Sequence, residues 1–441
     1  MVEDPNQKPN PLDGSDYKLS PELEKERKKT EIPVSGKRML PRVIAFVVLL
    51  GVGITFMVLG ILGFFSAESG LVAITVNEES GYRAGTEINF YYYLSGSSRE
   101  VNVKSSEISN VYSKAMKDAY RLTEDEFTFD GCDSLGRVNA HPNETLTIDS
   151  RLYDILADAT TRMGRDFYNA PLYRDWQKFM RFSMENLANF DPSVNPPEQA
   201  YIDSMVSLLS DESAVKLVLL GQNQVQLQVS SEALAWKNEY EYQGPWVTLG
   251  LMRNAYRIEY VKKELLAKGF ADGMLLSEDG ILASLGGLKN IKTNVYGFSY
   301  LQDSYAGVVG TLQLNELQTV SLVSHVGLGK QNDGWAYTLF PSDAENIRLR
   351  SLHIDPKTGE GYQDVTALML ASSTYSVPEV RAYSLLLAGS SGQGEIAAVS
   401  MAKHLTPIYC LKGETKTIHA STAVASAITL DTAGGYSILT D

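Results

Sequence analysis

The chain has 441 residues and a formal net charge of −14, and 21% of its residues are charged. An acidic protein of this composition is poorly suited to bind nucleic acid or an anionic lipid surface, so no nucleic-acid partner is expected. The length allows one large domain or two ordinary ones.

The N-terminal part of the chain combines a polar tail with one long apolar run. Residues 1–41 contain several prolines and many charges, and so few apolar residues that we predict a disordered tail. Residues 43–65 carry no charge and no proline. A helix rising about 1.5 Å per residue needs about 20 such residues to cross a bilayer. A secretory signal is the alternative, but its apolar region is usually about 7–15 residues long and lies nearer the N-terminus. We therefore predict a transmembrane helix at 42–65.

The charges beside this run indicate its orientation. Lys37, Arg38 and Arg42 precede the run, whereas Glu68 is the first charged residue after it. Lysine and arginine favour the cytoplasmic side of a membrane. The sequence therefore predicts a single-pass protein of the cell membrane with a cytoplasmic N-terminus. A linker at 66–88 and an extracytoplasmic domain at 89–441 would follow.

Hydrophobic periodicity predicts a mixture of helices and strands outside the membrane. Apolar residues recur at helical spacing within 108–119, 152–163 and 251–267. Apolar residues alternate with polar ones at 225–229, as in a half-buried strand, and 72–76 is a shorter candidate. The C-terminal third is rich in Val, Thr, Tyr and Gly, which is typical of strands joined by tight turns. The fold class predicted is α+β, with mixed sheets and packed helices.

Two local features leave alternatives open. The segment 191–197, which contains three prolines, fits either a hinge between domains or, better, a surface loop. Cys132 and Cys410 lie in no metal-binding or redox spacing, and they could form one disulfide or remain two separate thiols.

The segment His353–Gly359 is the strongest local signal for chemistry. Its Asp-Pro-Lys-Thr-Gly part is by itself an ordinary turn, in which Asp355 accepts a backbone hydrogen bond and Gly359 allows a positive φ. A histidine just before such a rigid turn can act as an acid, a base or a partner for an anion near neutral pH.

This segment resembles the His-Ile-(Ile)-Asp-Pro-x-Thr-Gly signature of the ApbE-like family, the FAD:protein FMN transferases. Other blocks similar to that family follow its order along the chain. They are Thr128-Phe129-Asp130 with Leu135, Arg137 and Asn139; Gly164-Arg165-Asp166-Phe167 after a helix; Thr248-Leu249-Gly250 with Tyr256; and 273–286. The resemblance covers most of 89–400.

The resemblance implies a fold, a chemistry and a set of site residues. Members of the family are extracytoplasmic, bind FAD and Mg²⁺, and transfer FMN onto a Ser or Thr of a target protein. It therefore implies a membrane protein as the partner for flavinylation or docking. It implies His353 as the catalytic residue. The cofactor-binding residues it implies are Gly250, Arg253, Tyr256, Gly280, Asp355 and Thr358. The metal ligands it implies are Glu379 and Ser384.

Several positions depart from the family pattern. Leu251 stands at the second glycine of the first Gly-Gly pair, Asn254 at the lysine after it, and Ile281 at the aspartate of the second motif. The favoured hypothesis is thus a degenerate relative, a pseudoenzyme that binds a partner or ligand without chemistry. The alternative is an active Mg²⁺-dependent transferase. A third possibility is an unrelated envelope module.

Plainer interpretations also exist for two of the implied residues. A carboxylate such as Glu379 is favourable at the start of a helix because of the helix dipole. Arg253 fits an exposed helix position as well as a phosphate ligand, since isolated basic residues are usually solvated.

Overall fold

The computed structural model describes residues 70–76, 88–96, 98–180, 189–289, 291–298, 306–314, 319–326, 336–339, 348–390, 392–414 and 416–440. The chain divides into two units, 1–63 and 64–441, and the described residues all belong to the second. The predicted tail and the predicted transmembrane helix at 42–65 lie outside the described residues. Within these ranges, no helix is both long enough and apolar enough to cross a membrane.

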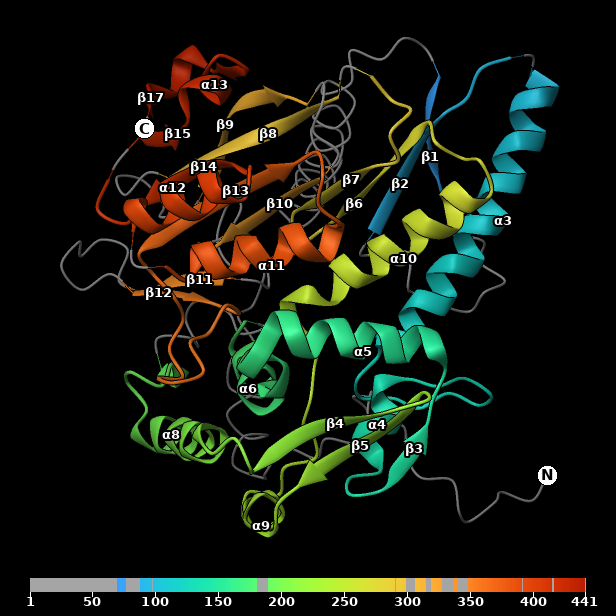
Figure 1. Ribbon diagram of the computed structural model, residues 1–441. Helices are drawn as coiled ribbons and strands as arrows, with labels where there is room; N and C mark the ends of the chain where they lie inside the picture. The colour runs from blue at the N-terminus through green and yellow to red at the C-terminus, as the bar shows by residue number, and fades with distance from the viewer. Residues whose placement is uncertain are drawn as a thin grey trace, which may run out of the picture. The chain divides into compact units, whose positions relative to one another are not determined.

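A nine-stranded sheet forms the centre of the second unit (Figure 1). Neighbouring strands pair antiparallel except for the last pair, which is parallel. In spatial order the strands are β1 (Leu71–Ile74), β2 (Ile88–Tyr93), β6 (Gly273–Ser277), β7 (Ile281–Ser284), β10 (Thr319–Ser324), β13 (Val365–Ser372), β14 (Thr406–Leu411), β15 (Thr417–Ala420) and β17 (Ser437–Thr440). Strand β13 is buried at every position, as expected for a central strand covered on both faces.

Four helices cover one face of this sheet. They are α3 (Ser98–Thr123), α10 (Arg253–Ala267), α11 (Val377–Ala388) and α12 (Gln393–Ala402). The apolar stripe of α3 packs with α10 against β2, β6 and β7. Helices α11 and α12 pack against β13 and β14 in a separate cluster. Figure 1 shows α10 and α11 lying one after the other across the strands.

A smaller sheet covers the opposite face. Its strands are β16 (Ile428–Leu430), β9 (Ala306–Gln313) and β8 (Lys292–Phe298), in that spatial order. Their apolar side chains share one core with β10, β13, β14 and β15. The short helix α13 (Thr422–Ala425) and the 3-10 turn η5 (Thr432–Gly434) lie between the last strands in the chain.

A third layer is built from helices and a three-stranded sheet. Its helices are α4 (Leu135–Ala140), α5 (Ser150–Met163), the 3-10 helix η3 (Gly164–Tyr168), α6 (Ala170–Phe179), α8 (Pro196–Ser210) and α9 (Ser231–Glu239). Its sheet has the order β3 (Thr145–Thr147), β5 (Gln224–Val229), β4 (Val215–Gly221). The hairpin of β11 (Ala336–Leu339) and β12 (Arg348–Ser351) contributes Tyr337 and Leu339 to the same core.

The predicted α+β class is confirmed, and the periodic segments fold as expected. The three predicted helices correspond to α3, α5 and α10, and the predicted strand at 225–229 is β5. The sheet begins earlier than the predicted domain boundary at 89, because β1 lies within the predicted linker and pairs with β2. Both cysteines are free thiols, and Cys410 is buried.

The segment 191–197 is a connection that is firmly anchored at its start. Asp191 is fully buried and forms an ion pair with Arg350, at 3.0 Å between Oδ2 and Nε. Asn195 then caps α8 by accepting a hydrogen bond from the Glu198 backbone N–H, and Pro196 begins the helix. The buried ion pair links this connection to β12, which leads directly to His353.

Candidate functional site

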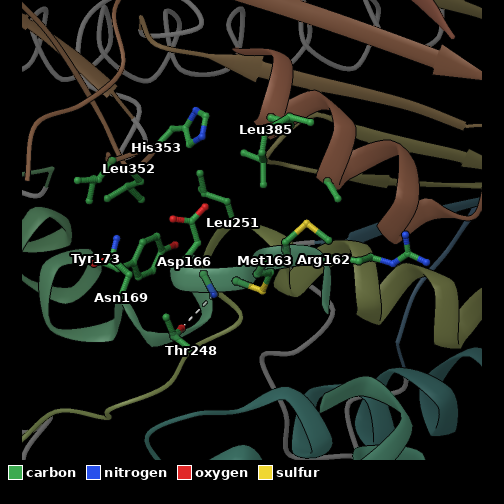
Figure 2. A pocket seen from close by; sticks show the side chains of 15 residues that line it. Arg162, Met163, Asp166, Asn169, Tyr173, Thr248, Leu251, Leu352, His353 and Leu385 are labelled. Carbon is green, nitrogen blue, oxygen red and sulfur yellow. Dashed lines mark hydrogen bonds between the residues drawn. The ribbon is translucent and has the colours of Figure 1, made fainter. Parts of the chain in front are cut away.

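A cavity of about 180 Å³ lies where α5, η3, α6 and α11 meet the loop around Leu251 and the segment after β12 (Figure 2). We call it the main cavity. The polar residues of its lining are Arg162, Asp166, Asn169, Tyr173, Thr248 and His353. Its apolar lining comes chiefly from Met163, Leu251, Met252, Leu352, Ile354 and Leu385. It is therefore a mostly apolar recess with a few polar groups, the usual composition of a ligand site.

A second, smaller cavity of about 40 Å³ adjoins the first, and we call it the small cavity. Leu251, Leu352 and His353 line both cavities and so form the wall between them. Asp279 and Arg381 line the small cavity only. Arg381 is nearly inaccessible to solvent. It connects two segments of the chain, because its Nε donates to Leu251 O at 3.0 Å and its Nη1 to Leu322 O at 2.7 Å.

His353 lies in the shared wall with its ring buried. Its Nδ1 is 3.0 Å from Nε2 of His325, and its ring centroid is 4.5 Å from that of Tyr362. Burial, followed by the proximity of His325 and Arg381, holds the pKa of His353 well below its usual range. Burial likewise lowers the pKa of His325 to about 4. Both rings are therefore neutral at neutral pH, and one of the two donates an N–H hydrogen bond to the other.

The turn after His353 uses Asp355 and Thr358 for its own structure. Asp355 Oδ1 accepts the Lys357 backbone N–H at 2.9 Å, and Thr358 Oγ1 accepts the Glu360 backbone N–H at 3.3 Å. The turn is held from outside by Trp176, whose Nε1 donates to Gly359 O at 2.9 Å. Neither Asp355 nor Thr358 lines the main cavity. Their roles in cofactor binding stay predictions.

The 3-10 helix η4 (Gly250–Met252), just before α10, brings one of the implied cofactor residues to the main cavity. Gly250 lines it, with φ at +44°, and its N–H donates to Thr248 Oγ1 at 3.0 Å. Arg253 instead pairs with the buried carboxylate of Asp125 at 2.5 Å. Tyr256 donates from its hydroxyl to Asp158 Oδ2 at 2.9 Å. It lines a different, surface groove between α5 and α10.

Gly280 lies in the tight turn between β6 and β7, with φ at +89°. A Cβ atom there would lie 2.8 Å from Leu322 Cβ, so packing alone requires glycine at this position. The adjacent Asp279 faces the small cavity, and its Oδ2 is 3.4 Å from Arg381 Nη2.

The two implied metal ligands lie on α11 and both are engaged with protein groups. Glu379 Oε2 accepts the backbone N–H of Ser376 at 2.9 Å and its hydroxyl at 2.7 Å, which caps the helix. Despite partial burial, these hydrogen bonds and the nearby Arg162 lower the pKa of Glu379. Ser384 is fully buried and donates to Val380 O at 2.8 Å. Across the ranges that the structure describes, no three His, Cys, Asp or Glu residues converge as a metal site.

Two functional candidates in the main cavity were not singled out from the sequence. Asp166 on η3 carries a carboxylate that extends into the cavity (Figure 2). Burial, reinforced by the negative charge of Asp355, raises the pKa of Asp166 to about 6. Asn169 follows one turn later, and its buried Oδ1 has no hydrogen-bond partner among the described residues. The sequence named Asp166 only as part of the block Gly164–Phe167, and an Asp and an Asn three residues apart in a turn are common.

Comparisons with solved structures identify the fold. The chain resembles an ApbE protein from Thermotoga maritima with a TM-score of 0.52 and 12% identity, over 81% of this chain and 98% of that one. It resembles the flavin transferase ApbE from Vibrio cholerae with a TM-score of 0.51 and 16% identity, over 77% and 95% of the two chains. No protein-family model and no curated protein matches the chain. The described unit therefore has an ApbE-like fold, and at these identities the likeness shows the fold alone.

Proposed function

We propose that this chain is a membrane-anchored relative of the flavin transferases whose extracytoplasmic domain acts by binding a ligand or a partner protein. The fold supports the relationship, and the apolar run at 43–65 with its flanking charges supports the anchor and the orientation. The observation that carries the binding role is Leu251. Its side chain lines both cavities at a position where the family has glycine.

The size of the main cavity does not match FAD. Pockets for small organic ligands usually measure about 300–1,000 Å³. The main cavity measures about 180 Å³, and the wall that contains Leu251 closes it from the small cavity. A dinucleotide would need this wall to move.

The charges around the main cavity do not match a pyrophosphate either. Arg162 lines the cavity, but it is paired with Asp158 at 2.7 Å and lies 3.4 Å from Glu379. The side chain of Asp166 presents an acidic group, which repels a phosphate when it is ionised. The capping role of Glu379 and the buried hydroxyl of Ser384 do not fit a Mg²⁺ site, because both groups are already hydrogen bonded within the protein.

The alternative is an active transferase that moves FMN from FAD to a Ser or Thr of a membrane partner. The position of His353 in the cavity wall favours it, since a neutral imidazole can take up a proton from a hydroxyl. Bound FAD would supply the activated phosphate bond for that chemistry, with Mg²⁺ as a counter-charge.

Titration of FAD into the full-length protein in detergent, with Mg²⁺ present, separates the two functions. The binding role predicts no co-purifying flavin and FAD affinity weaker than micromolar. Each lost charged contact costs about tenfold to a hundredfold in affinity. Leu251→Gly should improve FAD affinity by joining the cavities, whereas Leu220→Gly, at an exposed leucine of β4, should not.

The alternative, an active transferase, predicts the opposite result of this titration. Micromolar or tighter FAD binding, with FMN transfer to a Ser or Thr peptide that His353→Ala abolishes, would establish the transferase and refute the binding role.

A further inference from the structure

We propose that the main cavity binds a compact organic cation, an amine or amidine on an apolar ring or short chain, held by Asp166 and Asn169. This inference rests on the proposed function, because it requires a cavity that serves a ligand other than FAD. It names the chemical class of that ligand.

The volume of the main cavity sets the size of the ligand. An apolar cavity of about 150 Å³ in another protein accommodates benzene. The main cavity, at about 180 Å³, therefore has room for one small ring with a short substituent. Its wall of Met, Leu and Ile side chains favours an apolar body for the ligand.

The carboxylate of Asp166 supplies the charge that selects a cation. No side-chain hydrogen bond or ion pair of Asp166 is found within the described residues. Burial and the nearby charge of Asp355 oppose its ionisation, so a bound cation would relieve that cost. Arg162, the cationic residue of the cavity lining, is paired with Asp158 and so does not act as the counter-ion of Asp166.

Asn169 supplies a second acceptor in the lining of the main cavity. Asn169 is 6% exposed, and its side-chain Oδ1 lacks a hydrogen-bond partner in the described part of the chain. The backbone fixes the two residues together, because the Asn169 N–H donates to Asp166 O at 3.2 Å. The backbone N–H of Tyr173 donates in turn to the backbone oxygen of Asn169 at 2.9 Å. An ammonium or amidinium group carries several N–H donors, so it can serve more than one acceptor of the cavity lining.

The titration of Asp166 makes this binding depend on pH. The groups that face it are Asp355, the neutral His353, Tyr173, Tyr362 and Arg162. With a pKa of about 6, Asp166 is ionised above that pH and neutral below it. Affinity for a cation should therefore be full at pH 8 and fall as the pH drops through about 6, whereas a neutral ligand should show no such loss.

Calorimetric titration of the full-length protein with three probes tests the inference. Benzylamine is the cation, benzyl alcohol its neutral counterpart and benzoate the anion. We expect benzylamine to bind, benzyl alcohol to bind more weakly, and benzoate not to bind. Asp166→Asn should weaken benzylamine about tenfold to a hundredfold and leave benzyl alcohol nearly unchanged. Glu212→Gln removes one charge at an exposed site outside the cavity and is the control.

Each other outcome overturns the inference. Equal binding of benzylamine and benzyl alcohol, insensitive to Asp166→Asn, would identify a purely apolar cavity. Competitive displacement of benzylamine by Mg²⁺ would identify a metal site. Failure of all three probes without FAD binding would refute the ligand class and leave the proposed function standing. Tight FAD binding that excludes benzylamine would refute both.

Discussion

The buried ion pair between Arg350 and Asp191 should be a major stabilising contact, and Arg350→Met tests it. Both side chains are fully inaccessible, with Nε–Oδ2 at 3.0 Å and Nη2–Oδ1 at 3.1 Å. Tyr337 donates its hydroxyl to Asp191 Oδ2 at 2.8 Å, and the Arg350 guanidinium lies 5.2 Å from the ring centre of Trp176. Removal of one partner of a buried pair typically costs about 3–5 kcal/mol, because the other charge stays buried without its counter-ion.

The assay is urea denaturation followed by tryptophan fluorescence, which gives the free energy of unfolding. The pKa of Asp191 is lowered in the folded protein by Arg350 and by hydrogen bonds, despite its burial. The ion pair therefore stabilises the fold at pH values above about 4, the pKa of Asp191 in the unfolded chain. This contribution is lost as the pH falls through the pKa of Asp191 in the folded protein. In Arg350→Met the difference from wild type should accordingly be largest at neutral pH and shrink in acid.

Two controls separate this cause from general damage. Arg151→Met makes the same change at an exposed ion pair with Asp149 and should cost less than about 1 kcal/mol. Asp191→Asn in the Arg350→Met background removes the stranded charge and should recover part of the lost stability. Equal losses for Arg350→Met and Arg151→Met, or no recovery in the double variant, would refute the reasoning.

Three further predictions concern Glu379, the thiols and the topology. Glu379→Ala should lower stability by about 0.5–1 kcal/mol through loss of the helix cap, and less so in acid, because the folded pKa of Glu379 is lowered. Its thermal unfolding should respond to Mg²⁺ as the wild type does; a Mg²⁺-induced stabilisation present only in the wild type would identify a metal ligand. Cys132→Ser should leave ligand binding and stability nearly unchanged, because Cys132 is only half-buried. Cys410→Ser, at a buried site, should lower the free energy of unfolding measured in urea by roughly 0.5–3 kcal/mol. A large loss of stability in Cys132→Ser would contradict this prediction. Protease added to intact cells should digest the outer domain and leave an N-terminal tag protected, whereas protection of a C-terminal tag alongside digestion of an external marker would exclude the orientation.

The elements predicted best from the sequence are those whose pattern is long and local. The stripe within 108–119 repeats over several turns and forms α3, and the alternation at 225–229 forms β5. The predicted domain start at 89 leaves out β1, a short strand whose place in the sheet depends on pairing with β2. Pairing between strands is not visible in the periodicity of either strand alone.

The site was harder to predict because its residues come from distant parts of the chain. His353 has a local motif around it, so the sequence could single it out. Asp166 became a candidate only when the fold placed it beside the segment after β12, where Asp355 acts on its pKa. Arg350 and Asp191 are separated by 159 positions, and neither has a sequence signal that indicates the other.

The backbone conformation and the packing each favour glycine at one of two positions, Gly250 and Gly280. Gly250 has a positive φ that other residues rarely adopt, yet a Cβ there would meet nothing closer than Tyr173 at 3.8 Å. Its backbone conformation by itself accounts for glycine at this position. Gly280 is required by the turn and by Leu322.

Leu251 differs from the neighbouring Gly250 in that it has no positive φ, and its side chain contributes to the wall between the cavities. The family resemblance implies a glycine at this position and a lysine at Asn254, which lies on a buried face of α10. The proposed binding role predicts that the Leu251 side chain keeps FAD out, and Leu251→Gly tests this directly, because that variant removes the side chain from the wall between the cavities.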